Sequence, residues 1–99
     1  MKVVIDLQEG FEDDEVEIFD NEKRVLKAEN VKTRKQIGLA SSNEIDLKGN
    51  KATLRVEVPS RNIDERREIQ LSDDLHIAIS ISDGNKLTWK VQNSPFYYM

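Results

Sequence analysis

Few residues in this chain could perform acid–base or metal chemistry, and they are scattered. His76 is the only histidine, and cysteine is absent. Thiolate chemistry is therefore excluded, and a metal site or Ser-His-Asp triad built on His76 would have to be assembled from distant loops. No glycine-rich phosphate loop, GxSxG elbow or HExxH motif is present. We expect no enzyme activity, no catalytic residues and no cofactor.

Acidic side chains are concentrated near the start of the chain. Nine acids and no base lie between residues 6 and 22. Calcium needs several oxygen ligands that converge from a turn, and the acids of segment 9–15, with Asp73, Asp74 and Asp83, could supply them. EF-hand spacing is absent, so a solvated loop without metal is the preferred interpretation. Calcium binding in the acidic loops stays the alternative.

Basic side chains follow directly. Residues 23 to 35 contain six bases and a single acid. Within this segment Lys32, Arg34 and Lys35 form a predicted binding surface for an acidic partner, and Arg can hold carboxylates or phosphates in a bidentate manner. Arg61, Arg66 and Arg67 are candidates to join it. No aromatics alternate with these bases and the net charge is −4, so nucleic acid is disfavoured and a protein is the expected partner.

The sequence ends in "SPFYYM", and its last four residues include half of the six aromatics in the chain. One interpretation is structural: this tail, Met99 included, packs back on a row of small outward residues, Ala78, Ser80 and Ser82, because burying aromatics stabilises a small domain. The other is a recognition hook or a dimer contact. In either case the residues singled out are Phe96, Tyr97 and Tyr98. The second interpretation allows the protein to form a homo-oligomer.

The elements that must position these residues have a period of two. Apolar residues alternate at 2–7, 14–19, 52–58, 75–82 and 86–91, with weaker strand candidates at 23–28, 43–47 and 67–71. Pro59 is expected to end a strand and to precede a turn of helix. Segments 8–14, 30–42 and 59–67 do not fit strands. About seven to eight short strands predict one all-β domain over 1–99, a small antiparallel β-sandwich.

At fold level this strand pattern resembles transthyretin-like and immunoglobulin-like sandwiches. The resemblance spans the chain without a specific motif, and such folds carry unrelated functions. Trp89 is in phase with Leu87 and Val91, which predicts a core position; a sugar-stacking platform is the alternative.

The N-terminal apolar run is too short for a signal peptide, and no segment is long enough to span a membrane. We therefore expect a cytoplasmic protein without membrane contact. The expected function is that of a non-catalytic protein-interaction module. The alternative is a carbohydrate- or small-ligand-binding sandwich that uses Trp89 together with Tyr97 or Tyr98. Calcium dependence belongs to this alternative.

Overall fold

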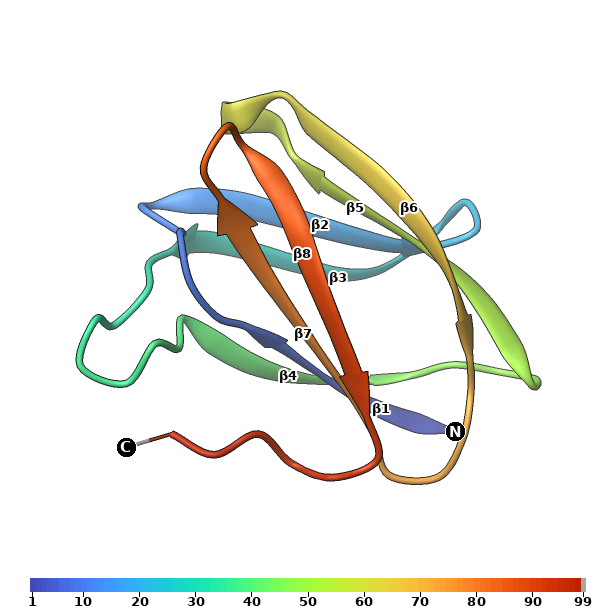
Figure 1. Ribbon diagram of the computed structural model, residues 1–99. Coiled ribbons are helices and arrows are strands. Elements are labelled where there is room, and N and C mark those ends of the chain that lie inside the picture. Colours follow the sequence, from blue (N-terminus) through green and yellow to red (C-terminus); the bar gives the residue numbers. More distant parts are fainter. Residues whose placement is uncertain (99) are drawn as a thin grey trace.

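Eight strands and one short helical turn make up the computed structural model, which describes residues 1–98 (Figure 1). The strands are β1 (Lys2–Leu7), β2 (Asp14–Asp20), β3 (Lys23–Val31), β4 (Ser41–Asp46), β5 (Lys51–Val58), β6 (Ile63–Gln70), β7 (Leu75–Ser82) and β8 (Lys86–Gln92). They form two four-stranded sheets with the orders β4-β1-β7-β8 and β3-β2-β5-β6. The two sheets pack on each other, so the predicted small all-β sandwich is confirmed.

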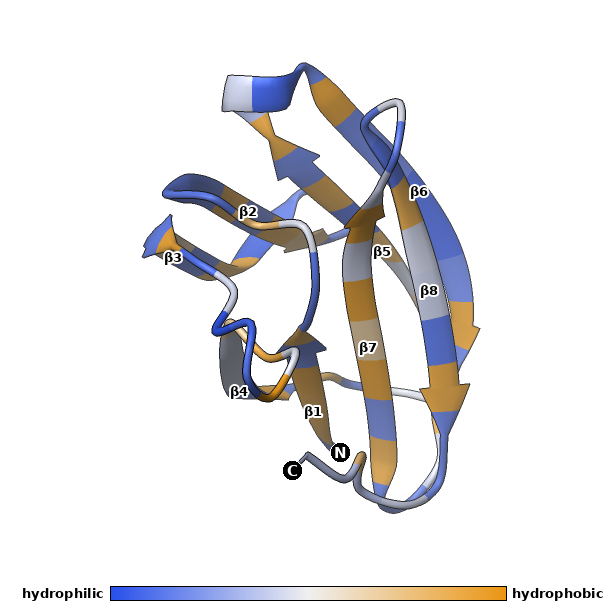
Figure 2. Cartoon of the chain, turned by 60° about the vertical axis from the view of Figure 1, so that its left-hand side comes forward, coloured by the Kyte–Doolittle hydropathy of each residue, from blue (hydrophilic) through white to orange (hydrophobic). Residues whose placement is uncertain are grey.

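The core lies between the two sheets and is built from every second residue of the strands. Figure 2 shows the resulting bands of apolar and polar residues along the strands. In β1, Val3, Ile5 and Leu7 are fully buried, and in β5 Leu54 and Val56 are as well. The alternation seen in the sequence therefore identifies the inner face correctly, because side chains in a strand point to opposite faces in turn.

The prediction of a purely antiparallel sandwich was wrong for one pair of strands. β1 lies between β4 and β7 and pairs in parallel with β7, from Val3 opposite Leu75 to Leu7 opposite Ile79. The chain leaves β1 for the other sheet and returns to β7 much later, so no hairpin forces the two strands to run in opposite directions. The sheet is consequently mixed.

β6 begins at Ile63, inside the segment that we expected to be irregular. The sequence shows no alternation of apolar and polar residues there, because two charged residues, Glu65 and Arg67, take inner-face positions. They are opposite the buried Val56 and Leu54 of β5. Charged residues can occupy these positions because β6 is an edge strand.

The expected helical turn after β5 is present as η1 (Pro59–Arg61), a single turn of 3-10 helix. Pro59 suits the first turn of a helix, since its missing N–H group would have no partner there. Asn62 ends the turn in the left-handed conformation, with φ of 57°. Among residues 1–98, no helix has the length and apolar character needed to cross a membrane.

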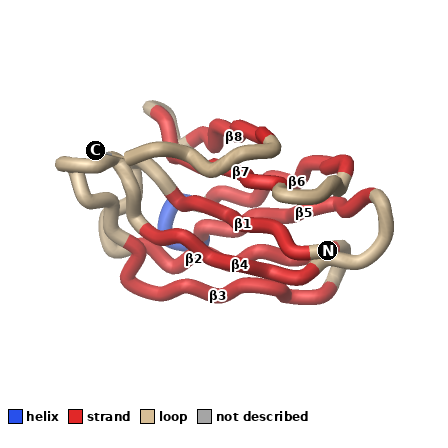
Figure 3. Tube along the Cα trace, turned by 90° about the horizontal axis from the view of Figure 1, so that it is seen from below, coloured by secondary structure: helices blue, strands red, loops and turns tan. Residues whose placement is uncertain are grey.

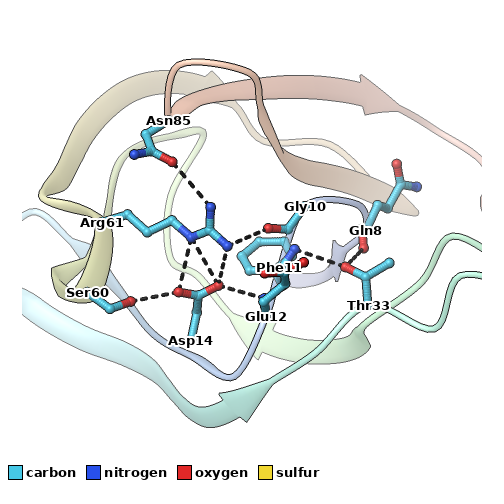
Figure 4. A network of polar contacts seen from close by, with 9 residues as sticks. All are labelled: Gln8, Gly10, Phe11, Glu12, Asp14, Thr33, Ser60, Arg61 and Asn85. Carbon is cyan, nitrogen blue, oxygen red and sulfur yellow. Dashed lines mark hydrogen bonds and ion pairs between the residues drawn. The ribbon is translucent and has the colours of Figure 1, made fainter.

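A buried ion pair closes one end of the sandwich (Figure 4). Asp14, at the start of β2, is only 3% exposed. Its carboxylate accepts hydrogen bonds from Arg61 Nε at 3.1 and 3.2 Å, from Ser60 Oγ at 2.6 Å and from the N–H of Glu12 at 2.8 Å. Burial alone raises the pKa of Asp14, but these hydrogen bonds and the charge of Arg61 together hold that pKa below its usual value.

The same arginine holds the loop between β1 and β2, which belong to different sheets. Arg61 Nη2 donates to the carbonyl of Gly10 at 2.8 Å. Gly10 has φ of +90°, and a Cβ atom there would lie 2.1 Å from the carbonyl oxygen of Ile81, so only glycine fits. The next residue, Phe11, is buried in the core. The loop between β1 and β2 is therefore part of the packed structure.

We predict that Arg61→Gln lowers the free energy of unfolding by about 3 kcal/mol, because it leaves the Asp14 carboxylate buried without its counter-ion. The stabilisation by Asp14 is present above the unfolded-state pKa of about 4 and is lost as pH falls through the lower folded-state pKa, so R61Q also flattens the acid side of the stability profile. Urea unfolding at several pH values measures both effects. The control R66Q, an exposed arginine, is expected to change stability by less than about 0.5 kcal/mol.

Candidate binding groove

The predicted basic residues Lys32, Arg34 and Lys35 lie in the loop between β3 and β4, and all three are exposed. They line a groove with a volume of about 800 Å³. A second hollow of about 530 Å³ shares Lys32, Thr33 and Lys35 with the groove. Its other side is the loop before β2, which contributes the acids Glu9, Glu12 and Asp13. The basic segment thus forms a ridge between two hollows.

Thr33 holds this ridge to the sandwich (Figure 4). Its hydroxyl donates to the carbonyl of Gln8 at 2.6 Å and accepts from the N–H of Phe11 at 3.1 Å. Its own N–H donates to the carbonyl of Phe11 at 3.0 Å. Because Phe11 is buried, the backbone between Lys32 and Arg34 is tied to the core.

The other half of the loop is closed on itself. The N–H of Arg34 donates to the carbonyl of Leu39 at 2.9 Å, and the carbonyl of Arg34 accepts from the N–H of Gly38 at 2.8 Å. Gly38 has φ of +69°, a conformation that glycine adopts at little cost. The backbone that carries the three bases is therefore ordered before any ligand arrives, which reduces the entropy cost of binding.

The floor of the groove is the open side of the sandwich between β3 and β4, which are edge strands of different sheets. Ser41 and Asn43 take inner-face positions of β4, opposite Leu7 and Ile5. These polar residues, together with the half-buried Ala28 of β3, fill less space than large apolar side chains would. The two sheets therefore leave a groove here rather than a closed core.

Electrostatics in the groove favour a negatively charged occupant. Within residues 1–98, no carboxylate lies within 4.0 Å of the charged nitrogens of Lys32, Arg34 or Lys35. Glu29 lines the groove too, but its carboxylate is 3.7 Å from Lys27 Nζ. Three bases are thus available to an acidic partner.

The structure does not bring the other arginines to this groove. Arg61 is held by Asp14. Arg66 and Arg67 lie on β6, at the opposite edge of the sheet from β3. Arg66 faces outward, opposite Arg55, whereas Arg67 faces inward. The basic site is therefore limited to the segment 32–35.

The acids proposed as calcium ligands are also separated. Asp83 follows β7 and lies at the same end as the acidic loop 9–13, whereas Asp73 and Asp74 precede β7 at its other end. Asp14 is occupied by Arg61. In the part of the chain that is described, no group of three or more His, Asp or Glu side chains is arranged to hold a metal ion, and His76 stands half-buried on the outer face of β7.

The C-terminal tail runs back across the outer face of the β4-β1-β7-β8 sheet (Figure 3). Tyr98 Oη donates to Asp6 Oδ2 at 2.6 Å and accepts from Gln8 Nε2 at 2.8 Å. Asp6 is 5% exposed, and the outward-facing Ala78 opposite it in register is 2% exposed. The tail thus packs back on the sandwich through Tyr98. Of the row expected beneath it, Ala78 is buried, Ser80 is half-buried and Ser82 is exposed.

The three tail aromatics have different surroundings. Phe96 and Tyr98 are half-buried, whereas Tyr97 is 90% exposed. Adjacent residues of an extended segment point to opposite sides, which accounts for the contrast between Tyr97 and Tyr98. Met99, the last residue of the predicted tail, lies outside the described residues.

Trp89 does not share a surface with Tyr98. It is half-buried on the inner side of β8 and packs against the core, whereas Tyr98 binds Asp6 on the outer face of the same sheet. The sheet thus separates the two side chains. A sugar platform built from this pair is not assembled.

We predict that Tyr98 ionises far above a free tyrosine, since burial and the neighbouring Asp6 carboxylate raise its pKa to about 12. The stabilisation is complete below the unfolded-state pKa of about 10 and is lost as pH rises towards 12. Tyr98→Phe removes the late step from a tyrosinate absorbance titration and lowers stability by about 1–3 kcal/mol. The neighbouring variant Y97F should keep the late step; its disappearance there would reverse the assignment.

No protein-family model matches the chain, and no curated protein matches its sequence. Its function is therefore argued from the geometry and charge of its own residues.

Proposed function

We propose that the protein is a non-catalytic interaction module that binds an acidic, extended segment of another protein in the groove between β3 and β4. The observation that carries this proposal is the ordered ridge of Lys32, Arg34 and Lys35, which form no ion pair within 4.0 Å among residues 1–98. In an acidic protein, unpaired bases held by a fixed backbone favour a negatively charged ligand.

The shape and lining of the groove support a peptide rather than a compact small molecule. The groove is open and runs along two edge strands, and its floor mixes small apolar with polar side chains such as Ala28 and Asn43. Edge strands carry unpaired backbone groups that an extended chain can use, with side-chain pockets providing specificity. The bases on the ridge would then pair with acidic residues of that chain.

A non-catalytic role is part of the proposal. The groove is lined by lysine, arginine, amide, hydroxyl and small apolar side chains, and its one carboxylate, Glu29, is 3.7 Å from Lys27 Nζ. Thr33, the hydroxyl nearest to the bases in sequence, is engaged by Gln8 and Phe11. Such a lining can hold a ligand, but it offers no nucleophile paired with a base.

We predict that a short peptide of alternating Glu and Gly shifts the amide NMR signals of residues 28–43, and that binding weakens with salt. The triple variant K32Q/R34Q/K35Q should weaken binding by about tenfold, the sum expected for three exposed ion pairs. The variant K23Q/K48Q/R66Q changes the net charge equally at exposed positions away from the groove and should bind almost as well as the wild type. Equal weakening by both variants would mean that only net charge matters and would contradict the proposal.

A further inference from the structure

The second open side of the sandwich lies between the edge strands β6 and β8, which run in the same direction (Figures 1 and 2). The two edges are pinned at one point, where Glu65 Oε2 accepts a hydrogen bond from the N–H of Leu87 at 2.9 Å. Beyond this pin the inner face of β8 becomes steadily more exposed. Leu87 is 8% exposed, Trp89 is half-buried and Val91 is 43% exposed.

The three residues nevertheless belong to the inner face. Leu87, Trp89 and Val91 are opposite Ile81, Ile79 and Ile77, which are core residues of β7. An inner-face valine that is 43% exposed lacks the cover that the other sheet gives to the rest of this face. The uncovered part of β8 is therefore a short apolar strip, from Trp89 to Val91.

The backbone of this strip is also free to pair. The N–H of Leu87 points to Glu65, and hence away from β7. In an antiparallel ladder the backbone groups of alternate residues point the same way, and the register between β7 and β8 is unbroken. The N–H and C=O groups of Trp89 and Val91 therefore point to the open edge as well.

One basic residue lies near the strip on each face of the sheet. Arg67 lies on the inner face of β6, two residues beyond the pinned Glu65, and Lys90 projects from the outer face of β8 beside Val91. Both are exposed, and within residues 1–98 neither has a carboxylate within 4.0 Å of its charged nitrogens. A second copy of this chain would bring its own lysines to the same edge, whereas an acidic strand would neutralise them.

We infer that the edge of β8 from Trp89 to Val91 is a strand-docking site for a partner segment in which apolar and acidic residues alternate. The apolar residues of that segment cover Trp89 and Val91, and its backbone pairs with their N–H and C=O groups. Its acidic residues alternate with the apolar ones, so they lie on the outer face of the extended sheet and face Lys90. This site is on the opposite side of the sandwich from the groove at β3 and β4 and does not depend on it.

The test uses a peptide of alternating Val and Glu, with a Val and Lys peptide as the probe of opposite charge. Because Trp89 is the only tryptophan, docking of the acidic peptide should shift the fluorescence emission to shorter wavelength. It should also slow hydrogen exchange at the amides of Trp89 and Val91 by about tenfold or more. The Lys peptide should have neither effect.

Two variants check the contacts. Val91→Pro removes one free N–H without touching the ladder to β7, since proline is tolerated at a strand edge, and should abolish docking. Should V91P fail to fold, Lys90→Gln gives an independent answer: it should weaken docking about two- to fivefold, the size expected for one exposed ion pair. The control K86Q removes an exposed charge from the same face of β8, before Leu87, and should have little effect.

Three results would overturn the inference. The first is an unchanged Trp89 emission with peptide in excess. The second is a set of amide shifts confined to residues 28–43, which would assign acidic peptides to the β3 and β4 groove alone and leave the proposed function intact. The third is a Trp89 shift that follows protein concentration without peptide, together with a dimer in sedimentation, which would make a second copy the occupant.

Discussion

The arrangement of this protein depends on the pairing of Asp14 with Arg61. A carboxylate with 3% exposure is unfavourable unless it is neutralised and fully hydrogen-bonded. Arg61 neutralises the charge and supplies part of the hydrogen bonds, which Ser60 and the N–H of Glu12 complete. Arg61 also binds the carbonyl of Gly10. Gly10 positions Phe11 in the core, and Phe11 holds Thr33 at the base of the ridge. One buried charge is thus connected, contact by contact, to the segment that presents the binding residues.

The sequence determines the strands more clearly than their partners. Alternation predicts β7 and β8 almost to the residue, because each has one face against the core. It misplaces the start of β6, where Glu65 and Arg67 face inward at an open side of the sandwich. It also cannot reveal the parallel pairing of β1 with β7, since pairing between distant strands leaves no mark on the period of either one.

The site is predictable to a similar degree. The charge count alone identifies Lys32, Arg34 and Lys35, but the floor of the groove comes from β3 and β4, which only the sheet order brings together. The sequence does contain one sign of the groove: Ser41 and Asn43 are small or polar at positions of β4 where the alternation places inward-facing residues. Asp14 could not be told from the eight other acids of its stretch, nor Tyr98 from Tyr97, because burial is a property of the fold and not of the residue type.

The parallel pairing of β1 and β7 has a consequence for the order of folding during translation. All four strands of the β3-β2-β5-β6 sheet leave the ribosome before β7 does, so that sheet can form first. β1 is synthesised before any of them, yet its partner on one side is made almost last. Until then, the apolar strand β1 has one unpaired edge, and its pairing with β7 is a slow, long-range closure. Of the strands of this sandwich, the first to be made is thus among the last to be paired on both sides.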